Sequence, residues 1–212
     1  EEAGASVSII DDTPPEPSVE QVESILAAAQ GTAWDLVIGI GGGSAMDVAK
    51  IVAVMLNNDV KLRDLLNKAP IPRRGIPTVM VPTTAGTGSE ATPNSIILVP
   101  EDELKVGIVS PKLMPDCVIL DPQMTLGLPP AITASTGMDA LCHAIECYTS
   151  KKGNPFSEMI ALKAIRLISR SIREAFKNGK NLDARHDMLL GAFYGGMCIA
   201  ASSTTAVHAL AY

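Results

Sequence analysis

The chain has 212 residues, of which 17 are Lys or Arg and 23 are Asp or Glu, so its formal net charge is −6. Its 47% hydrophobic and 19% charged residues are typical of a globular protein and exclude a disordered or fibrous one. The acidic balance argues against a nucleic-acid partner, because phosphate binding draws on clustered Lys and Arg. The length predicts one full domain plus part of another. Because the chain starts at Glu1, we expect either a fragment or a processed product.

No secretory signal opens the chain, and its four cysteines lack zinc-ribbon spacing. We therefore expect a cytoplasmic protein whose thiols are reduced and mostly buried. The segment 188–212 contains no Asp, Glu, Lys or Arg and is long enough to cross a membrane as a helix. Its glycines, serines and threonines lower its apolar density, so we favour a buried core helix and expect no membrane partner.

The first 120 residues alternate between strand and helix patterns. A short strand is expected at 6–10, and Ser18 begins a helix with Gln21 in the capping-box position. The apolar run 34–40 predicts a strand covered on both faces, and a second helix follows at about 44–56. Further strands are expected at 76–81, 95–99, 105–109 and 117–120. Alternation of this kind predicts an α/β fold with a mostly parallel, Rossmann-like sheet.

The strand signals stop near Pro129-Pro130, and the remaining sequence is helical in character. We expect helices at about 130–149, 156–177 and 182–212, with glycine or proline at the joints. We place a domain boundary in the segment Asp121–Pro130. Residues 1–125 then form an α/β domain, and residues 126–212 form an all-helical domain.

The loop 41–44, Gly-Gly-Gly-Ser, links a predicted strand to a predicted helix. Glycines let the backbone approach an anion, and the amide groups and dipole of the helix point at it, so the loop suits a phosphate. Ser44 with Asp47 also fits a capping box, and the spacing alone leaves both readings open. Met46 stands where a dinucleotide fingerprint has its third glycine. Asp59 lies in a polar stretch, so we assign it to a solvated loop.

A second loop, residues 82–90, follows another buried strand and reads Pro-Thr-Thr-Ala-Gly-Thr-Gly-Ser-Glu. Its hydroxyl groups gather at the carboxyl end of that strand, where open α/β sheets bind their ligands. Taken alone, the loop is better explained as a hydroxyl-rich connecting turn.

A possible metal site comes from Asp139 and His143, which share one face of a helix because they are four residues apart. An oxygen and an imidazole nitrogen on one face can bind iron or zinc, although an Asp–His hydrogen bond is the favoured reading of the pair alone. His208 adds a third potential ligand from a segment of small apolar residues. His186 lies in a charged run and is assigned to a solvated helix face. Glu146 is a weaker candidate, expected at the surface or behind the ligands.

Together these motifs resemble the iron-containing (group III) alcohol dehydrogenases. The resemblance rests on Gly-Ile-Gly-Gly-Gly-Ser-Ala-Met-Asp-Val-Ala-Lys (39–50), the loop 82–90, and Thr-Gly-Met-Asp-Ala-Leu-Cys-His-Ala-Ile-Glu (136–146). Asp121-Pro122 and Leu128-Pro129-Pro130 lie between them in the matching order, and 206–210 is similar to the family's third metal-binding segment. It covers essentially the whole chain.

The resemblance implies that residues 1–125 are part of an NAD(P)-binding domain and residues 126–212 part of an all-helical metal domain, with one divalent metal in the cleft between them. It implies that the cofactor pyrophosphate is lined by Gly42, Gly43, Ser44 and Asp47. It places Thr83, Thr84 and Thr87 on the adenosine side of the cofactor and Lys105 near the ribose. Three of the family's four metal ligands match Asp139, His143 and His208, with iron(II) favoured and zinc as the alternative.

The chain departs from the family pattern at three places. The fourth ligand, a histidine, is expected beyond Tyr212, and the opening strand and helix of the nucleotide domain before Glu1. We therefore expect a chain truncated at both ends that binds metal weakly and is inactive by itself. At Tyr212 many relatives carry a histidine that has been assigned a proton-relay role. A tyrosine can donate a hydrogen bond there but is a poorer base at neutral pH, and we assign Tyr212 as a catalytic residue on this basis.

The resemblance implies a metal-dependent NAD(P) alcohol dehydrogenase or aldehyde reductase that moves hydride between the nicotinamide and a small alcohol or aldehyde. The metal would act as a Lewis acid on the substrate oxygen. One alternative is a lyase similar to dehydroquinate synthase, which uses NAD only transiently. A non-catalytic nucleotide-binding fragment is the other. The composition is also compatible with a homo-oligomer.

Overall fold

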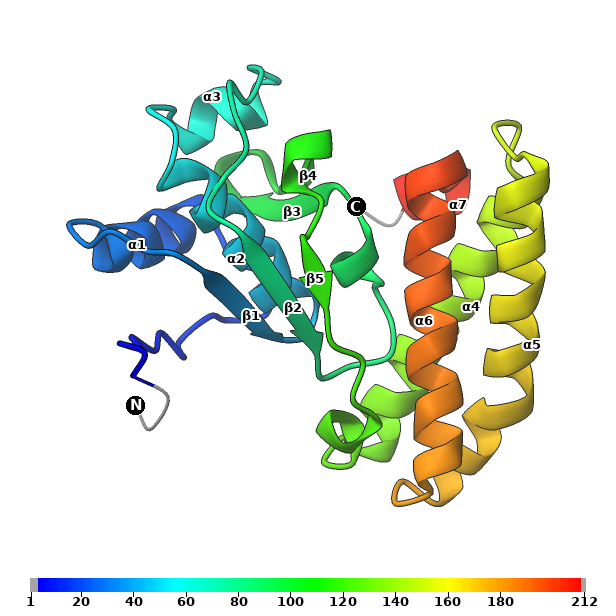
Figure 1. Ribbon diagram of the computed structural model, residues 1–212. Helices are drawn as coiled ribbons and strands as arrows, with labels where there is room; N and C mark the ends of the chain where they lie inside the picture. The colour runs from blue at the N-terminus through cyan, green and yellow to red at the C-terminus, as the bar shows by residue number, and fades with distance from the viewer. Residues whose placement is uncertain (1–3, 211–212) are drawn as a thin grey trace.

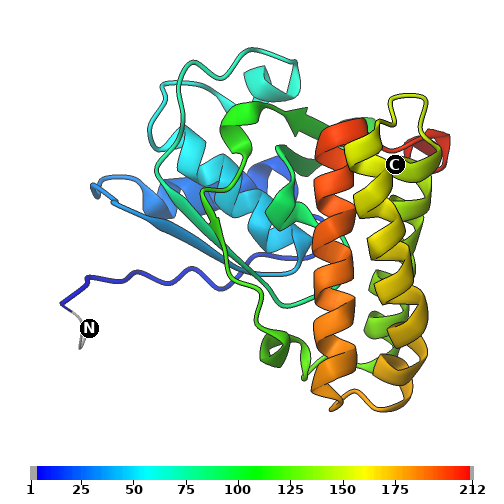
Figure 2. The same cartoon turned by 45° about the vertical axis from the view of Figure 1, so that its right-hand side comes forward.

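An α/β part and a bundle of helices lie side by side (Figure 1). The structure, a computed structural model, describes residues 4–210, without the side chain of Ala209. Turned by 45°, the long helices stand together as one layer against the α/β part (Figure 2). The predicted boundary at residues 125–126 falls between the 3-10 helix η4 (Pro122–Thr125) and helix α4 (Pro130–Thr149).

The strands of the described chain form two separate sheets. Strands β1 (Val37–Gly41), β2 (Thr78–Pro82) and β5 (Cys117–Val118) are parallel in the order β1-β2-β5. Strands β3 (Asn94–Val99) and β4 (Leu104–Val109) pair antiparallel in a two-stranded sheet. Their connection contains only the 3-10 helix η2 (Pro100–Asp102), which is too short for the crossover that parallel strands need. The mostly parallel sheet is thus confirmed for β1, β2 and β5, and the hairpin is an addition to it.

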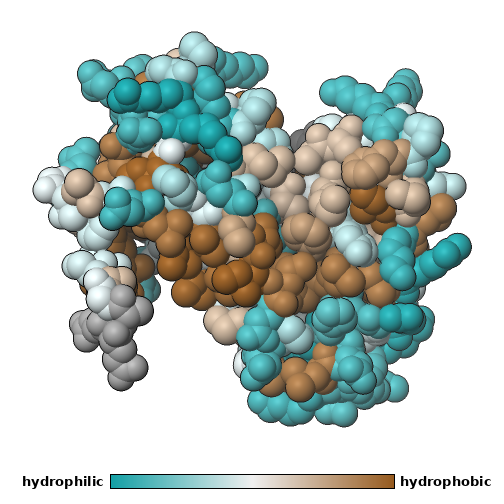
Figure 3. Space-filling model, in the orientation of Figure 1, coloured by the Kyte–Doolittle hydropathy of each residue, from teal (hydrophilic) through white to brown (hydrophobic). Residues whose placement is uncertain are grey.

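Strand β1 is not covered on both faces, contrary to the sequence prediction. Ile38 and Ile40 are 53% and 57% exposed, whereas Met80 on the neighbouring strand is fully buried. The predicted strand at 6–10 is also wrong: these residues are exposed and pair with no strand among the described residues. A strand requires a hydrogen-bonding partner, and β1 pairs only with β2 in this part of the chain. Figure 3 shows the resulting band of hydrophobic surface across β1 and β2 and on toward the helices.

The core of the α/β part lies between helices and the β3–β4 sheet. Helix α1 (Val19–Ala29) begins at Ser18, which forms the predicted capping box with Gln21. Helix α2 (Gly43–Met55) and the short helix α3 (Leu62–Leu66) pack beside it. The fully buried members of this core include Val19, Val22, Ile51 and Ile97. Burial of each such side chain contributes about 1.5–3 kcal/mol. Helix η3 (Pro111–Leu113) leads from β4 to β5.

The bundle consists of α4, α5 (Pro155–Lys177) and α6 (Leu182–Ser202), followed by the short α7 (Ala206–Leu210). Fully buried small residues at the helix contacts, Ala140, Ala161 and Ala164 among them, let the helices approach closely. Among the described helices, none is long and apolar enough to cross a membrane. The four cysteines are free, but only Cys147 and Cys198 are buried.

The helix predicted at 182–212 is interrupted. Helix α6 ends at Ser202, and Ser203 has a positive φ of 72° while its N–H donates to the carbonyl of Ile199. The run Ser-Ser-Thr-Thr at 202–205 supplies hydroxyl groups that compete for backbone hydrogen bonds, which explains the break. After this turn α7 lies close to α4, and His208 faces the α/β part.

Candidate functional site

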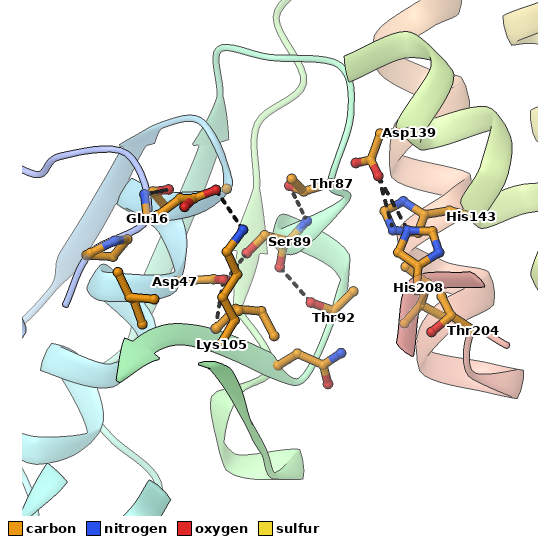
Figure 4. Close-up of a pocket in the computed structure, with 17 residues that line it drawn as sticks. Glu16, Asp47, Thr87, Ser89, Thr92, Lys105, Asp139, His143, Thr204 and His208 are labelled. Atoms are coloured by element: carbon orange, nitrogen blue, oxygen red, sulfur yellow. Dashed lines mark hydrogen bonds and ion pairs between the residues drawn. The ribbon is translucent and has the colours of Figure 1, made fainter. Parts of the chain in front are cut away.

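A cavity of about 390 Å³ lies between the α/β part and the bundle. Its α/β side includes five of the residues implied by the family resemblance: Gly43, Ser44, Asp47, Thr87 and Lys105. Its helical side includes Asp139, His143 and His208. In Figure 4 the two groups face each other across the open space. Segments that are far apart in the sequence therefore meet at one cavity.

Gly42, Thr83 and Thr84 do not line this cavity, although the resemblance places them at the cofactor. The backbone N–H of Thr83 donates to the carbonyl of Gly41 at 2.9 Å. A side chain at Gly42 would meet the methyl group of Thr84 at 3.4 Å. Thr83 and Thr84 therefore lie next to the glycine loop, and their assignment to the cofactor stays a prediction.

The glycine loop leads directly into α2, whose N-cap is Gly42 without a side-chain cap. The capping box of Ser44 and Asp47 is therefore not formed, and the Ser44 hydroxyl instead accepts a hydrogen bond from the backbone N–H of Glu16. The first amide groups of a helix have no partner within the helix. Those of α2 open beside the cavity, where they can bind an anion. Gly43 allows the Thr87 side chain to pack closely against the start of α2, because a Cβ there would lie 2.7 Å from the methyl group of Thr87.

Asp47 lines the cavity, but its carboxylate is engaged inside the protein. It accepts hydrogen bonds from the Ser89 hydroxyl at 2.5 Å and from the Ile96 amide at 2.9 Å. It also pairs at 3.0 Å with Lys50, which is only 1% exposed. Lys50 in turn donates to Ser89 and to the backbone carbonyl of Asn94. This buried network ties α2 to the loop 82–90, and sequence reasoning did not identify Lys50.

Glu90 is a further buried carboxyl group that sequence reasoning did not single out. It is 2% exposed and lies in the 3-10 helix η1 (Ser89–Ala91). Burial raises the pKa of Glu90 to about 7, against the lowering effects of its own backbone N–H and of Lys50. The group therefore changes its charge near neutral pH, next to the Lys50–Asp47 pair.

Lys105 reaches the cavity from β4. Its ammonium group lies 2.6 Å from a carboxylate oxygen of Glu16 (Figure 4). Glu16 thus contacts both Lys105 and, through its backbone N–H, the Ser44 hydroxyl on α2. No motif in the sequence pointed to Glu16, because it lies in a proline-rich turn far from every other site residue.

On the helical side Asp139, His143 and His208 place one ligand atom each within 4.8 Å of one another. Nε2 of His208 lies 3.4 Å from Oδ1 of Asp139, and Nε2 of His143 lies 3.8 Å from the same oxygen. The two imidazole rings stack, with centroids 4.3 Å apart. The spacing of Asp139 and His143 on α4 and the turn before α7 together produce this cluster.

The cluster fits a divalent metal. Tetrahedral ligands at about 2.0–2.1 Å from zinc lie roughly 3.4 Å apart, which is close to the separations observed here. Two imidazoles and a carboxylate are donors that iron and zinc both accept. Burial lowers the pKa of His143 despite the opposing effect of Asp139, which favours the neutral ring that a metal requires. Nδ1 of His143 is buried and has no hydrogen-bond partner among the described residues.

Glu146 is buried and lies behind the cluster. One carboxylate oxygen is 2.5 Å from Nδ1 of His208, and the other accepts two hydrogen bonds from Thr205. Burial alone would raise the pKa of Glu146, but these contacts outweigh it and the pKa is lowered.

Three other residues named in the sequence analysis lie away from this cluster or cannot be placed. His186 and Asp59 are exposed, as predicted. The predicted catalytic residue Tyr212 lies outside the described residues.

Comparison with known proteins agrees with these features. Residues 1–122 match the family model for iron-containing alcohol dehydrogenase, and residues 133–212 match the C-terminal model of the same family. Long-chain-alcohol dehydrogenase 1 of Geobacillus thermodenitrificans is 43% identical over 99% of this chain and 53% of its own length.

Solved structures show the same likeness. The iron-containing alcohol dehydrogenase of Thermotoga maritima matches with a TM-score of 0.92 at 39% identity, over 100% of this chain and 57% of that protein. The sulfoacetaldehyde reductase of Bifidobacterium kashiwanohense, solved in complex with NAD+, matches with a TM-score of 0.92 at 35% identity over 97% and 55%. The chain thus spans about half the length of these relatives. By sequence and fold, it belongs to the iron-containing alcohol dehydrogenases.

Proposed function

We propose that this chain carries the cofactor site and three metal ligands of an NAD(P)-dependent alcohol dehydrogenase that interconverts small alcohols and aldehydes. The observation that carries the proposal is the cavity that the α2 N-terminus shares with Asp139, His143 and His208. A glycine loop for phosphates and a ligand set for a metal are thereby placed in one space. Residues 1–125 and 126–212 act as its two domains.

On the cofactor side, the free amides at the start of α2 bind the pyrophosphate, since they combine donor groups with the positive end of the helix dipole. Gly43 lets the phosphates approach, and Thr87 and Ser44 supply hydroxyl donors at the same wall. Lys105 provides a positive charge near the ribose once Glu16, with which it is paired, moves aside for the cofactor. Thr83 and Thr84 support this loop from behind.

On the metal side, Asp139, His143 and His208 hold the metal, for which we propose iron(II). When bound, the metal polarises the oxygen of the alcohol or aldehyde as a Lewis acid. Burial favours the neutral form of the His143 ring, and the Asp139 carboxylate offsets part of the positive charge. The cavity walls orient the substrate between this cluster and the cofactor and limit the access of water.

The test uses the full-length product of the reading frame that encodes the chain, loaded with iron(II) or zinc. Small primary alcohols, diols and aldehydes are screened with NAD and NADP by the absorbance of the reduced cofactor. We expect a steady absorbance change in both reaction directions, whereas a lyase that recycles its NAD gives no net change. Absence of a steady change with every substrate would contradict the proposal.

A pair of variants tests the site itself. Asp139→Ala should remove the bound metal and lower turnover by at least about 100-fold, because a charged ligand is lost. His186→Ala, at an exposed position on α6, is the matched control and should leave both unchanged. Elemental analysis of the purified proteins measures the metal content, and unchanged metal in Asp139→Ala would refute the ligand assignment.

A further inference from the structure

Glu146 continues the face of α4 that carries the metal cluster. Asp139, His143 and Glu146 are spaced four and three residues apart, so they share one side of the helix. The first two reach the cavity, while the side chain of Glu146 is only 7% exposed and does not line it. A buried carboxylate needs strong compensating contacts, and those of Glu146 all come from the segment around α7.

These contacts divide between the two carboxylate oxygens. Oε2 accepts the backbone N–H and the hydroxyl of Thr205, each at 2.7 Å. Oε1 lies 2.5 Å from Nδ1 of His208. An ionised carboxylate can only accept hydrogen bonds, so the proton of this contact belongs to Nδ1. An imidazole that binds a metal is neutral, so with its one proton on Nδ1 it offers Nε2 as the ligand atom.

That free nitrogen is the one directed at the cluster. Nε2 of His208 lies 3.4 Å from Oδ1 of Asp139, on the side of the ring opposite to Glu146. We propose that Glu146 is a positioning residue of the metal site, which fixes the Nδ1-protonated form of His208 and holds α7 so that Nε2 points at the metal. This inference rests on the proposed function, which assigns His208 as a metal ligand, and it names Nε2 as the ligand atom.

The alternative is that Glu146 only anchors the turn before α7. Two variants separate these roles. Glu146→Gln replaces the obligate acceptor by an amide that can also donate to Nδ1, so His208 is no longer confined to one tautomer. Thr205→Val removes the hydroxyl bond to Oε2 but leaves the Glu146–His208 contact, so it is the matched control for anchoring.

The experiment measures zinc affinity of the full-length product by competition with a chelator, and the tautomer of His208 by ¹⁵N NMR. We expect Nδ1 of His208 to carry the proton in the unmodified, zinc-bound protein. Glu146→Gln should weaken zinc binding about 10- to 100-fold, the usual effect of losing a partner behind a ligand, and populate the other tautomer. Thr205→Val should change the affinity by less than about threefold and keep the tautomer.

The outcomes distinguish failure of the proposed function from failure of the role proposed for Glu146. Asp139→Ala is included as the reference for the metal site, and unchanged zinc affinity in that variant would overturn the proposed function and the inference together. If Asp139→Ala loses zinc while Glu146→Gln binds it normally, only the inference is wrong. Zinc bound through Nδ1 of His208, with the proton on Nε2, would also overturn it, and this measurement needs no variant. Equal losses in Glu146→Gln and Thr205→Val would assign Glu146 to anchoring alone.

Discussion

The ammonium nitrogen of Lys50 lies 2.7 Å from the hydroxyl oxygen of Ser89, and this contact joins α2 to the loop that carries Thr87. Lys50 is almost fully buried and also pairs with Asp47, so the wall of the cavity on the α/β side is built on a charged network. A buried pair of this kind contributes little net stability, but loss of one partner is costly.

Replacement of Lys50 by methionine should therefore destabilise the protein. The change keeps the apolar stem but leaves the Asp47 carboxylate buried without its cation, which costs about 3–5 kcal/mol. Urea unfolding followed by circular dichroism measures the free energy of unfolding. Lys163→Met, at an exposed position on α5, is the control and should change it by less than about 0.5 kcal/mol. Similar values for the two variants would show that the buried Asp47 carboxylate does not depend on Lys50.

Glu90 should make stability depend on pH near neutrality. Its folded-state pKa of about 7 lies above the ordinary value of 4.5, so the folded state holds the proton more tightly than the unfolded state. The contribution of Glu90 to the free energy of unfolding is therefore fully present at pH below about 4.5. It is lost as the pH rises through 7, by about 3 kcal/mol at most. Glu90→Gln should remove this fall, while Glu23→Gln at an exposed site should retain it. Parallel pH profiles for the unmodified protein and Glu90→Gln would contradict the prediction.

Gly196 should be intolerant of a side chain. A Cβ at this position would lie 2.3 Å from the carbonyl oxygen of Gly88, which itself has a positive φ of 62°. Gly196→Ala should destabilise the protein by about 1–3 kcal/mol, because the clash involves backbone and forces α6 away from η1. At Gly127 a Cβ meets nothing within 4 Å, so Gly127→Ala is the control. Thermal unfolding measures both, and equal midpoints would contradict close packing at this contact.

A substitution at Gly43 should separate cofactor binding from metal binding. A Cβ there would meet the Thr87 side chain at 2.7 Å, at the mouth of the α2 N-terminus. We expect Gly43→Ala to raise the Kd for NAD+ about tenfold, equivalent to about 1.4 kcal/mol, with zinc content unchanged. Calorimetric titration of the full-length product gives the Kd, with Gly127→Ala again as the control. Loss of zinc together with NAD+ would point to misfolding and not to a local effect.

Local signals in the sequence identified much of the fold. Helices α1 and α4 were predicted closely because capping and proline signals act within a few residues. Spacing also placed Asp139 and His143 on one face. It did not predict the break at Ser203, because four hydroxyl residues in an apolar run allow either a continuous helix or a turn. The position of His208 depends on that break, so the sequence offered His208 as a third potential ligand without showing how it reaches the pair on α4.

Long-range burial was the main source of error. Lysine is almost never fully buried, so Lys50 was not considered as a core residue. The apolar pattern of β1 predicted two covered faces, but Ile38 and Ile40 are exposed in the described chain. The sequence allowed two positions for Glu146, at the surface or behind the ligands. It could not decide between them, because the contacts of Glu146 are with Thr205 and His208, about sixty residues away.

Because the chain breaks at Ser203, the cluster of Asp139, His143 and His208 comes from two helices of very different length. Asp139 and His143 lie on α4, a helix of 20 residues that packs within the bundle. His208 lies on α7, a helix of only five residues. A helix that short is unstable in isolation, so its placement depends on the bonds that fasten it. If the three residues hold a metal as proposed, placement of α7 and binding of the metal are linked equilibria, and each favours the other by the same free energy.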